Sequence, residues 1–252
     1  MQDQYSRTQL LLGKEAMETL HHSRVAVFGI GGVGGYTVEA LARSGVGALD
    51  LIDDDKVCLT NLNRQIVATR KTVGQYKVDV AEQRIHEIDP NIKVTTYKTF
   101  FTPETQDQFD FTQYDYVVDA IDLVSCKLDL IETAISRGLP IISALGTGNK
   151  LDPTQFRISD LSKTEGCPLA RVVRKELRKR GINHLKVVYS KEEPLSPAQP
   201  IQTEAPAGQD TRPGSTARRA TPGSISFVPA AAGLILAGEV VRDLSAGTAP
   251  KP

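Results

Sequence analysis

The sequence predicts an α/β protein with a doubly wound, mostly parallel, Rossmann-like sheet to which antiparallel C-terminal strands are added. Short β-branched runs alternate with helical stretches over the first 150 residues, a pattern typical of a parallel sheet covered by helices. A glycine loop at residues 29–34 directly follows the first run, and Asp53 and Asp122 directly follow two others. Ligands of such sheets bind outside the carboxyl ends of the strands. The sequence therefore predicts the place of a site before it predicts a substrate.

Apolar periodicity and turn residues place the elements in order along the chain. Residues 5–20 are predicted to form a helical entry segment, and residues 24–28 form the first strand. The other predicted strands are apolar or β-branched runs at residues 48–52, 93–97, 116–121 and 140–144. The predicted helices run from the glycine loop to Gly45, from 74 to 88 and from 127 to 137.

The pattern changes after residue 150. Residues 155–158 alternate as an added antiparallel strand would, and a helix is predicted from Pro168 to Arg180 because proline favours the first helical turn. Residues 192–223 are rich in Pro, Ala, Thr and Gly and poor in large apolar side chains. We therefore predict a mobile crossover loop over the nucleotide site. A last strand at 225–228 and a last helix at 230–244 are predicted to return to the core.

Length and composition limit the class of protein. The chain has 252 residues, 40% of them apolar, and no net formal charge, so we interpret residues 1–252 as one domain. Balanced charge argues against a surface that binds nucleic acid over its whole extent. Three widely separated cysteines predict neither a disulfide framework nor a tetra-thiolate zinc site, and they favour a reducing, cytoplasmic location. The N-terminus lacks the apolar core of a secretory signal, and the apolar stretch 227–237 is shorter than a bilayer span of roughly 20 residues.

The glycine loop is the first candidate site. Gly29, Gly31, Gly32 and Gly34 place backbone N–H groups at a helix N-terminus, where the helix dipole favours phosphate. Asp53 follows the next strand, where an acid accepts hydrogen bonds from ribose hydroxyls. A tight turn without a ligand is the alternative, but the strand, loop, helix and acid together favour nucleotide binding.

Two cations and a second acid favour a nucleoside triphosphate over a dinucleotide. Arg64 and Lys77 would neutralise a polyphosphate and its pyrophosphate leaving group, which hydride transfer does not require. Asp122 could hold a magnesium ion that bridges phosphate oxygens, whereas Asp119 is interpreted as structural. Asn61 could donate to phosphate, or it could bond its own backbone turn.

Taken together, these residues resemble the ThiF/MoeB/HesA family of adenylating enzymes, whose fold is shared with ubiquitin-activating enzymes. The similarity covers most of the first 150 residues and is carried by the glycine loop, Asp53, Asn61, Arg64, Gln65, Gly74-Gln75-x-Lys77 and Asp119-Ala-Ile-Asp122. The resemblance implies that these positions bind ATP and magnesium. It also implies a homodimer in which Arg7 reaches into the partner subunit's site, so that Arg7, Arg64 and Asp122 serve catalysis.

Three later segments are similar to the tRNA threonylcarbamoyladenosine dehydratase branch of this family: 152–155, 160–170 and 223–229. The resemblance implies ATP-dependent dehydration of threonylcarbamoyladenosine in tRNA, through carboxylate adenylation and intramolecular ring closure. Branches that activate ubiquitin-like sulfur-carrier proteins commonly carry paired Cys-x-x-Cys zinc sites, which this sequence lacks. Such an enzyme stays the alternative, and a dinucleotide oxidoreductase or a nucleotide-sensing scaffold is a further rival. A sulfur-relay protein partner is left open.

The helix predicted at 168–180 carries the main basic cluster. Its candidate tRNA contacts are Arg171, Arg174, Lys175 and Arg178, joined by Arg218 and Arg219 of the crossover loop. A solvated helix face is the alternative.

Cys167 lies just before this helix, where a thiol can become a nucleophile. Because ring closure needs no protein nucleophile, we interpret Cys167 as a small capping residue. The four histidines show no metal-ligand spacing.

Overall fold

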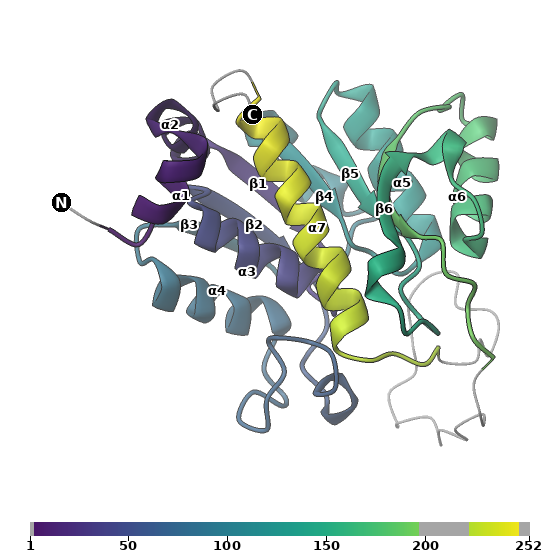
Figure 1. Cartoon of the computed structure of the whole chain (residues 1–252), viewed down its shortest axis with the longest axis horizontal. Helices are drawn as coiled ribbons and strands as arrows, with labels where there is room; N and C mark the ends of the chain where they lie inside the picture. The colour runs from purple at the N-terminus through teal and green to yellow at the C-terminus, as the bar shows by residue number, and fades with distance from the viewer. Residues whose placement is uncertain (1–2, 197–221, 247–252) are drawn as a thin grey trace.

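The computed structural model describes residues 3–196 and 222–246, and it contains a seven-stranded sheet with helices on both faces (Figure 1). The strands are β1 (Arg24–Phe28), β2 (Ala48–Ile52), β3 (Lys93–Tyr97), β4 (Tyr116–Asp119), β5 (Ile141–Ala144), β6 (Phe156–Asp160) and β7 (Lys186–Ser190). Their order in the sheet is β3-β2-β1-β4-β5-β7-β6. Neighbouring strands are parallel except for β6 and β7, which are antiparallel. The predicted fold class is confirmed.

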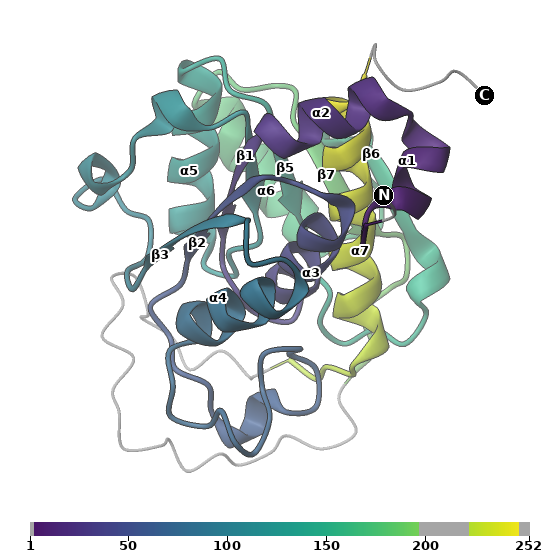
Figure 2. The same cartoon turned by 90° about the vertical axis from the view of Figure 1, so that its left-hand side faces the viewer.

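Helices cover the two faces of the sheet in two layers. The helices are α1 (Ser6–Leu12), α2 (Lys14–His22), α3 (Gly34–Ser44), α4 (Lys77–Ile88), α5 (Val124–Ser136), α6 (Pro168–Lys179) and α7 (Phe227–Leu244). Figure 2 shows α5 and α7 on opposite sides of the strands. A separate cluster of buried apolar side chains fills each face, and four phenylalanines dominate the cluster on the α5 face. In the described part of the chain, no helix combines the length and the apolar character that crossing a membrane requires.

Several predicted boundaries differ from the structure, each for a local reason. The entry helix is broken at Gly13, whose φ of 86° interrupts the helical backbone and separates α1 from α2. The predicted strand at 225–228 is wrong, because α7 already begins at Phe227 with Pro229 in its first turn, where a missing N–H costs nothing. Strand β7 was not predicted. Of the predicted crossover loop, residues 197–221 lie outside the described residues, and with them Arg218 and Arg219.

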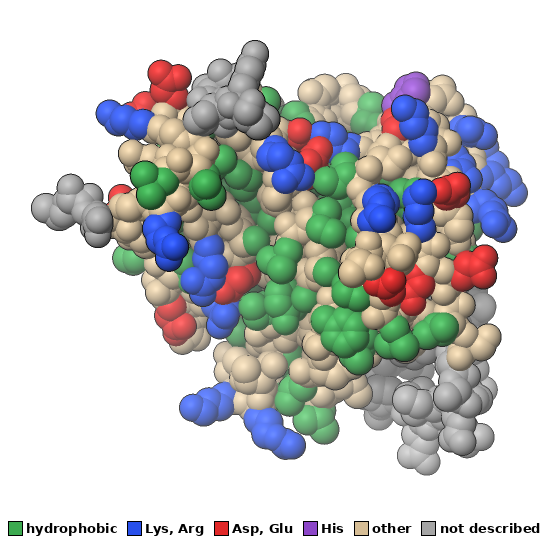
Figure 3. Space-filling model, viewed as in Figure 1, with side chains coloured by type: hydrophobic (Ala, Val, Ile, Leu, Met, Phe, Trp, Pro, Cys, Tyr) green, Lys and Arg blue, Asp and Glu red, His purple; other side chains and the backbone are tan. Residues whose placement is uncertain are grey.

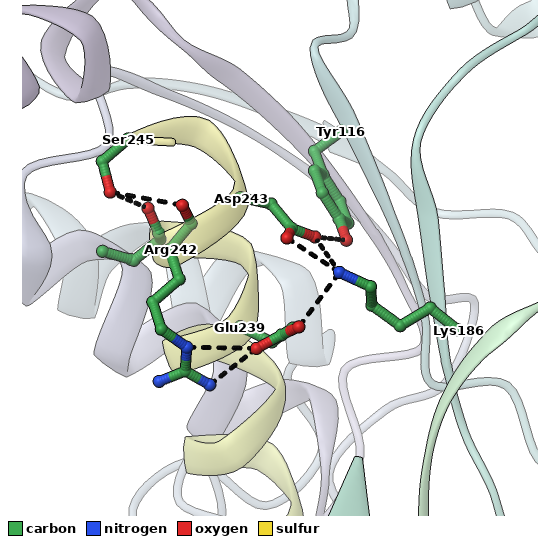
Figure 4. A network of polar contacts seen from close by, with 7 residues as sticks. Tyr116, Lys186, Glu239, Arg242, Asp243 and Ser245 are labelled. Atoms are coloured by element: carbon green, nitrogen blue, oxygen red, sulfur yellow. Dashed lines mark hydrogen bonds and ion pairs between the residues drawn. The ribbon is translucent and has the colours of Figure 1, made fainter. Parts of the chain in front are cut away.

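Helix α7 is held along its length by residues distant in sequence. Near its first half, Thr37 Oγ1 of α3 donates a hydrogen bond of 3.1 Å to the carbonyl of Gly233. Near its end, Lys186 of β7 pairs with Asp243 at 2.7 Å and with Glu239 at 3.0 Å, and the Tyr116 hydroxyl of β4 also donates to Asp243 (Figure 4). The polar network therefore fixes the last helix across β4 and β7.

Candidate functional site

A cleft of about 480 Å³ lies at the carboxyl ends of β1, β2 and β4. The chain proceeds from β1 toward β2 on one side and from β4 toward β5 on the other, so this is the switch point at which ligands of such sheets bind. The cleft is lined by these predicted site residues: Gly29, Gly31, Gly32, Asp53, Asn61, Arg64, Gln65, Lys77 and Asp122. The fold thus gathers in one place residues that are up to 93 positions apart in the chain (29 to 122).

The glycine loop has two kinds of glycine. A Cβ on Gly29 would lie 2.6 Å from the Ala120 carbonyl oxygen, and one on Gly34 would lie 1.8 Å from the Gly29 oxygen. These two residues allow the loop to pack against the end of β4 and against its own helix. Gly31 and Gly32 line the cleft, whereas Gly34 does not. Gly31 and Gly32 therefore bring the backbone to the cleft just before the start of α3.

Asp53 braces the glycine loop as well as lining the cleft. Its Oδ2 accepts a hydrogen bond of 2.7 Å from the backbone N–H of Ile30, inside the loop, and its Oδ1 accepts one of 2.9 Å from Asp55 N–H. The sequence predicts that the Asp53 carboxylate binds ribose. In the structure, each of its oxygens already accepts one hydrogen bond from a backbone N–H group.

Lys77 carries a buried positive charge at the first residue of α4. Its Nζ lies 2.7 Å from Asp55 Oδ2 and 3.4 Å from Asp53 Oδ1. Burial lowers the pKa of Lys77, but the two carboxylates overcome this effect and raise the pKa above its usual value. Lys77 therefore stays protonated in the cleft, and its positive charge can bind an anionic ligand.

The segment after β2 presents three polar side chains to the cleft. Asn61 Oδ1 accepts a hydrogen bond of 3.1 Å from Cys58 N–H, so the local turn uses part of its side chain. Arg64 Nη1 donates to the Thr60 carbonyl at 2.9 Å and to Asn63 Oδ1 at 3.0 Å, which holds the guanidinium at the cleft. Gln65 is buried, and its Oε1 has no hydrogen-bond partner among the described residues. A buried acceptor of this kind calls for a donor from a ligand or water.

The two aspartates after β4 have different environments. Asp119 is fully buried, pairs with Lys127 Nζ at 2.6 Å and accepts a hydrogen bond of 3.0 Å from Ile121 N–H, so its structural interpretation is confirmed. Asp122 is exposed in the cleft and makes no hydrogen bond or ion pair with another described residue. Its carboxylate is therefore available to a ligand.

Sequence reasoning missed two further walls of the cleft. The apolar wall consists of Phe28, Ile52, Phe100, Phe101, Ile121, Leu123, Cys126 and Leu145. The second wall consists of Gly146, Thr147, Gly148, Leu169, Pro222, Ser224 and Pro229. A signal for the second wall was present, because Gly146-Thr147-Gly148 follows β5 as the glycine loop follows β1. The phenylalanines carry no comparable signal, since aromatic residues are far more often simply core.

Other predicted residues lie outside the cleft. Arg7 is exposed on α1 and does not line the cleft of its own protomer. On α6, Arg171, Lys175 and Arg178 are exposed, whereas Arg174 Nη1 donates to the Leu161 carbonyl and to the carbonyl and hydroxyl of Thr164. Figure 3 shows Lys and Arg side chains gathered at the edge of the molecule where α6 lies.

Cys167 caps α6 rather than facing the cleft. The residue is buried, and its Sγ accepts a hydrogen bond of 3.5 Å from Ala170 N–H. Cys167 does not line the cleft. This agrees with the interpretation of a small capping residue.

Comparison with known proteins identifies the family. The model of the ThiF family matches residues 5–251. A tRNA threonylcarbamoyladenosine dehydratase of Bacillus subtilis is 46% identical over 245 residues, which are 97% of this chain and 95% of that protein. The solved structures of E. coli tRNA N6-threonylcarbamoyladenosine dehydratase in complex with ATP and with AMP are 33% and 34% identical, each with a TM-score of 0.83, and both comparisons cover 96% of this chain and 94% of theirs. The chain therefore belongs to the ThiF family.

Proposed function

We propose that this chain adenylates the carboxylate of N6-threonylcarbamoyladenosine in tRNA and promotes its cyclisation with loss of one water. One observation carries the proposal. A single cleft joins a glycine loop, Lys77, Arg64 and the available carboxylate of Asp122, in a chain that aligns over 97% of its length with a named dehydratase. The same fold binds ATP and AMP in the E. coli relative.

ATP would occupy the cleft with its phosphates at the start of α3. N–H groups near Gly31 and Gly32 and the ammonium of Lys77 would hold the phosphates, and the free donors of Arg64 would face the charge that develops on the leaving pyrophosphate. The buried amide of Gln65 would receive its missing donor from the nucleotide. Asp53 would accept from ribose, and Asn61 would donate from its amide nitrogen.

Asp122 is the residue that would hold a magnesium ion. Its exposed carboxylate has no partner among the described residues, and magnesium prefers such oxygen ligands. Asp53, Asp54 and Asp55 also bring carboxylate oxygens within 4.8 Å of one another, but Lys77 pairs with two of these side chains. When bound, the ion would neutralise charge on the phosphate oxygens.

The reaction then follows from carboxylate chemistry. A carboxylate oxygen of the modified base attacks the α-phosphorus of ATP, and the bond to pyrophosphate breaks, which leaves an acyl-adenylate. The ureido group of the same nucleoside attacks the activated carbonyl, loses a proton and expels AMP as the ring closes. An attacking group held in the same molecule has a large effective concentration, so no protein nucleophile is required, in agreement with the buried position of Cys167.

We further propose a homodimer in which Arg7 serves the partner's cleft. On the same short helix, Leu10 and Leu11 expose 85% and 78% of their surface, and a dimer interface would cover them. Sedimentation of the purified chain at the mass of one protomer would contradict this assembly.

We also propose that the reaction takes place in the cytoplasm, because the three free cysteines suit a reducing compartment.

Helix α6 would bind tRNA phosphates through Arg171, Lys175 and Arg178, which are exposed on one face. Replacing Lys175 by Ala is expected to weaken tRNA binding and to lower the slope of log affinity against log salt by about one. Lys179→Ala on the same helix is the matched control, because that ammonium already pairs with Glu176 at 2.8 Å. Filter binding at several salt concentrations measures the affinity for tRNA and its salt dependence. A slope in Lys175→Ala equal to the wild-type slope would contradict binding of tRNA by α6.

Mass analysis of nucleosides tests the function itself. Threonylcarbamoylated tRNA is incubated with the protein, ATP and magnesium, beside a sample without ATP. The expected result is ATP-dependent loss of one water from the modified nucleoside. An unchanged mass, together with ATP–pyrophosphate exchange stimulated by the C-terminus of a ubiquitin-like protein, would instead favour a sulfur-carrier adenylating enzyme, with a sulfur-relay protein as its partner.

A further inference from the structure

We propose that the wall formed by residues 146–148, Leu169 and residues 222–224 is the subsite for the carboxylate-bearing nucleoside, and that Asn149 is the residue that positions this wall. The proposal rests on the function proposed above and names where the second substrate lies. All of these residues belong to the described part of the chain, and the wall residues Gly146, Thr147, Gly148, Leu169, Pro222 and Ser224 line the cleft.

The cleft divides into two parts with different chemistry. Charged and amide side chains that suit polyphosphate stand in the segment after β2, at the start of α4 and after β4: Asp53, Asn61, Arg64, Gln65, Lys77 and Asp122. The wall formed by residues 146–148, Leu169 and residues 222–224 contains no charged side chain, and it offers the hydroxyls of Thr147 and Ser224, neither of which bonds another described residue. Uncharged donors and an apolar Leu169 suit a nucleobase with a ureido group better than they suit phosphates.

The two parts of the cleft adjoin each other, as the proposed reaction requires, because the carboxylate of the modified nucleoside must reach the α-phosphate of ATP. A Cβ on Gly32 would lie 3.3 Å from Pro229 and 3.5 Å from Arg64 Cγ, so the phosphate-facing glycine, the arginine and the start of α7 are in contact range. Asn63 Nδ2, beside Arg64, donates a hydrogen bond of 2.9 Å to the Ser224 carbonyl. The wall is therefore tied directly to the segment that carries Arg64.

Asn149 makes three hydrogen bonds, two of them to Gly223 in the wall and one to Leu195. Its N–H donates to the Gly223 carbonyl at 2.8 Å, its Oδ1 accepts from Gly223 N–H at 2.6 Å, and its carbonyl accepts from Leu195 N–H at 2.7 Å. Just before it, Gly148 allows a close approach, because a Cβ there would lie 2.8 Å from Pro222 Cβ. One residue thus joins the loop after β5 to the segment that precedes α7.

The backbone of Asn149 explains why an asparagine serves at this position. Its φ of 58° is positive, which no other non-glycine residue shows in the part of the chain that the structure describes. Asparagine adopts this left-handed conformation more readily than most residues do, and its short side chain provides the acceptor for Gly223. Glycine would keep the conformation but lose the acceptor, and alanine would lose both advantages.

The entry route fits a nucleoside attached to tRNA. Leu169 lies in the first turn of α6 and lines the cleft, whereas Arg171, Lys175 and Arg178 continue outward along the exposed face of the same helix. A base turned out of an RNA loop would enter beside Leu169 while its flanking phosphates follow the helix. Through Leu169, the wall is therefore continuous with the helix whose exposed face is proposed to bind tRNA.

Steady-state kinetics of four proteins tests the proposal: the wild type, Asn149→Gly, Asn149→Ala and Gly146→Ala. The KM for threonylcarbamoylated tRNA is expected to rise from the wild type to Asn149→Gly to Asn149→Ala, by about tenfold or more in the last. Gly146→Ala places a methyl group in the subsite without a clash, since its nearest neighbour would be Leu169 at 3.7 Å, and it is expected to raise the same KM. The Kd for ATP, measured by calorimetry without tRNA, is expected to stay at the wild-type value in all four.

Three results would overturn the inference or its basis, and they can be told apart. A wild-type KM for tRNA in Asn149→Ala and Gly146→Ala would overturn the subsite. A loss of ATP affinity in the Asn149 variants would also overturn the subsite, because Asn149 would then support the whole cleft and not only the site of the second substrate. If the wild type itself removes no water from the modified nucleoside, the proposed function fails and the subsite fails with it.

Discussion

Replacing Arg64 by Ala is expected to lower the rate of pyrophosphate release by about 10²–10³-fold. Arg64 is held at the cleft by the Thr60 carbonyl and by Asn63, so its guanidinium is already in place before charge develops on the leaving group. An interaction that strengthens in the transition state affects kcat more than it affects substrate binding. Pyrophosphate release from ATP in the presence of threonylcarbamoylated tRNA measures the effect, and the KM for ATP is expected to change much less.

Two further variants separate charge from geometry in this prediction. Arg64→Lys keeps the charge but loses the planar fork of donors, so only part of the activity is expected to return. Arg43→Ala is the matched control, since Arg43 is an exposed arginine of α3 that pairs with Glu39 and does not line the cleft. A rate within a few-fold of the wild type in Arg64→Ala would remove this residue from the catalytic machinery.

Replacing Lys127 by Met is expected to destabilise the fold by about 3–5 kcal/mol, because it leaves the carboxylate of Asp119 buried without its cation. Both side chains of this pair are fully buried, and Lys127 also donates to Ser143 Oγ and to the Ala144 carbonyl. One ammonium thus joins the ends of β4 and β5 to α5. In a domain of this size the loss corresponds to a decrease in Tm of roughly 6–20 °C, which calorimetry measures.

Lys186→Met serves as the comparison for the buried pair. Lys186 also contacts two carboxylates, Glu239 and Asp243, but its side chain is 36% exposed, so water can solvate the charges that remain. A loss of about 1 kcal/mol is expected there. Equal losses in Lys127→Met and Lys186→Met would show that burial is not what makes the Asp119–Lys127 pair important.

The local patterns of the sequence predicted the first five strands better than the part of the sheet that follows them. Strands β1, β2 and β3 have the predicted bounds, since each is a short β-branched or apolar run between clear turn signals. Strand β7 was missed because Lys186–Ser190 follows a polar stretch and has a lysine at its start. The predicted strand at 225–228 is wrong because α7 is apolar nearly all round, and apolar runs without periodicity do not distinguish strands from buried helices.

The candidate site was predictable where one strand end supplies one polar residue, and unpredictable where distant segments meet. Asp53, Lys77 and Asp122 follow recognisable strand or loop signals, and all three line the cleft. The wall that contains Pro222 and Ser224 depends on the contact between Asn149 and Gly223, which are 74 residues apart. No local pattern encodes such a contact, and the second use of Asp53 as a brace for Ile30 is equally invisible in the sequence.

The docking of α7 against α3 has a consequence for the order in which the molecule is completed during synthesis. The bond from Thr37 to Gly233 joins residues 196 positions apart, and Pro229 at the start of the same helix lines the cleft. The first five parallel strands can pair while the ribosome is still translating, but the cleft lacks a wall until the last part of the chain has emerged. Contacts between such distant residues form late in folding, so a nascent or truncated chain that ends before α7 carries an open nucleotide site and an uncovered sheet face.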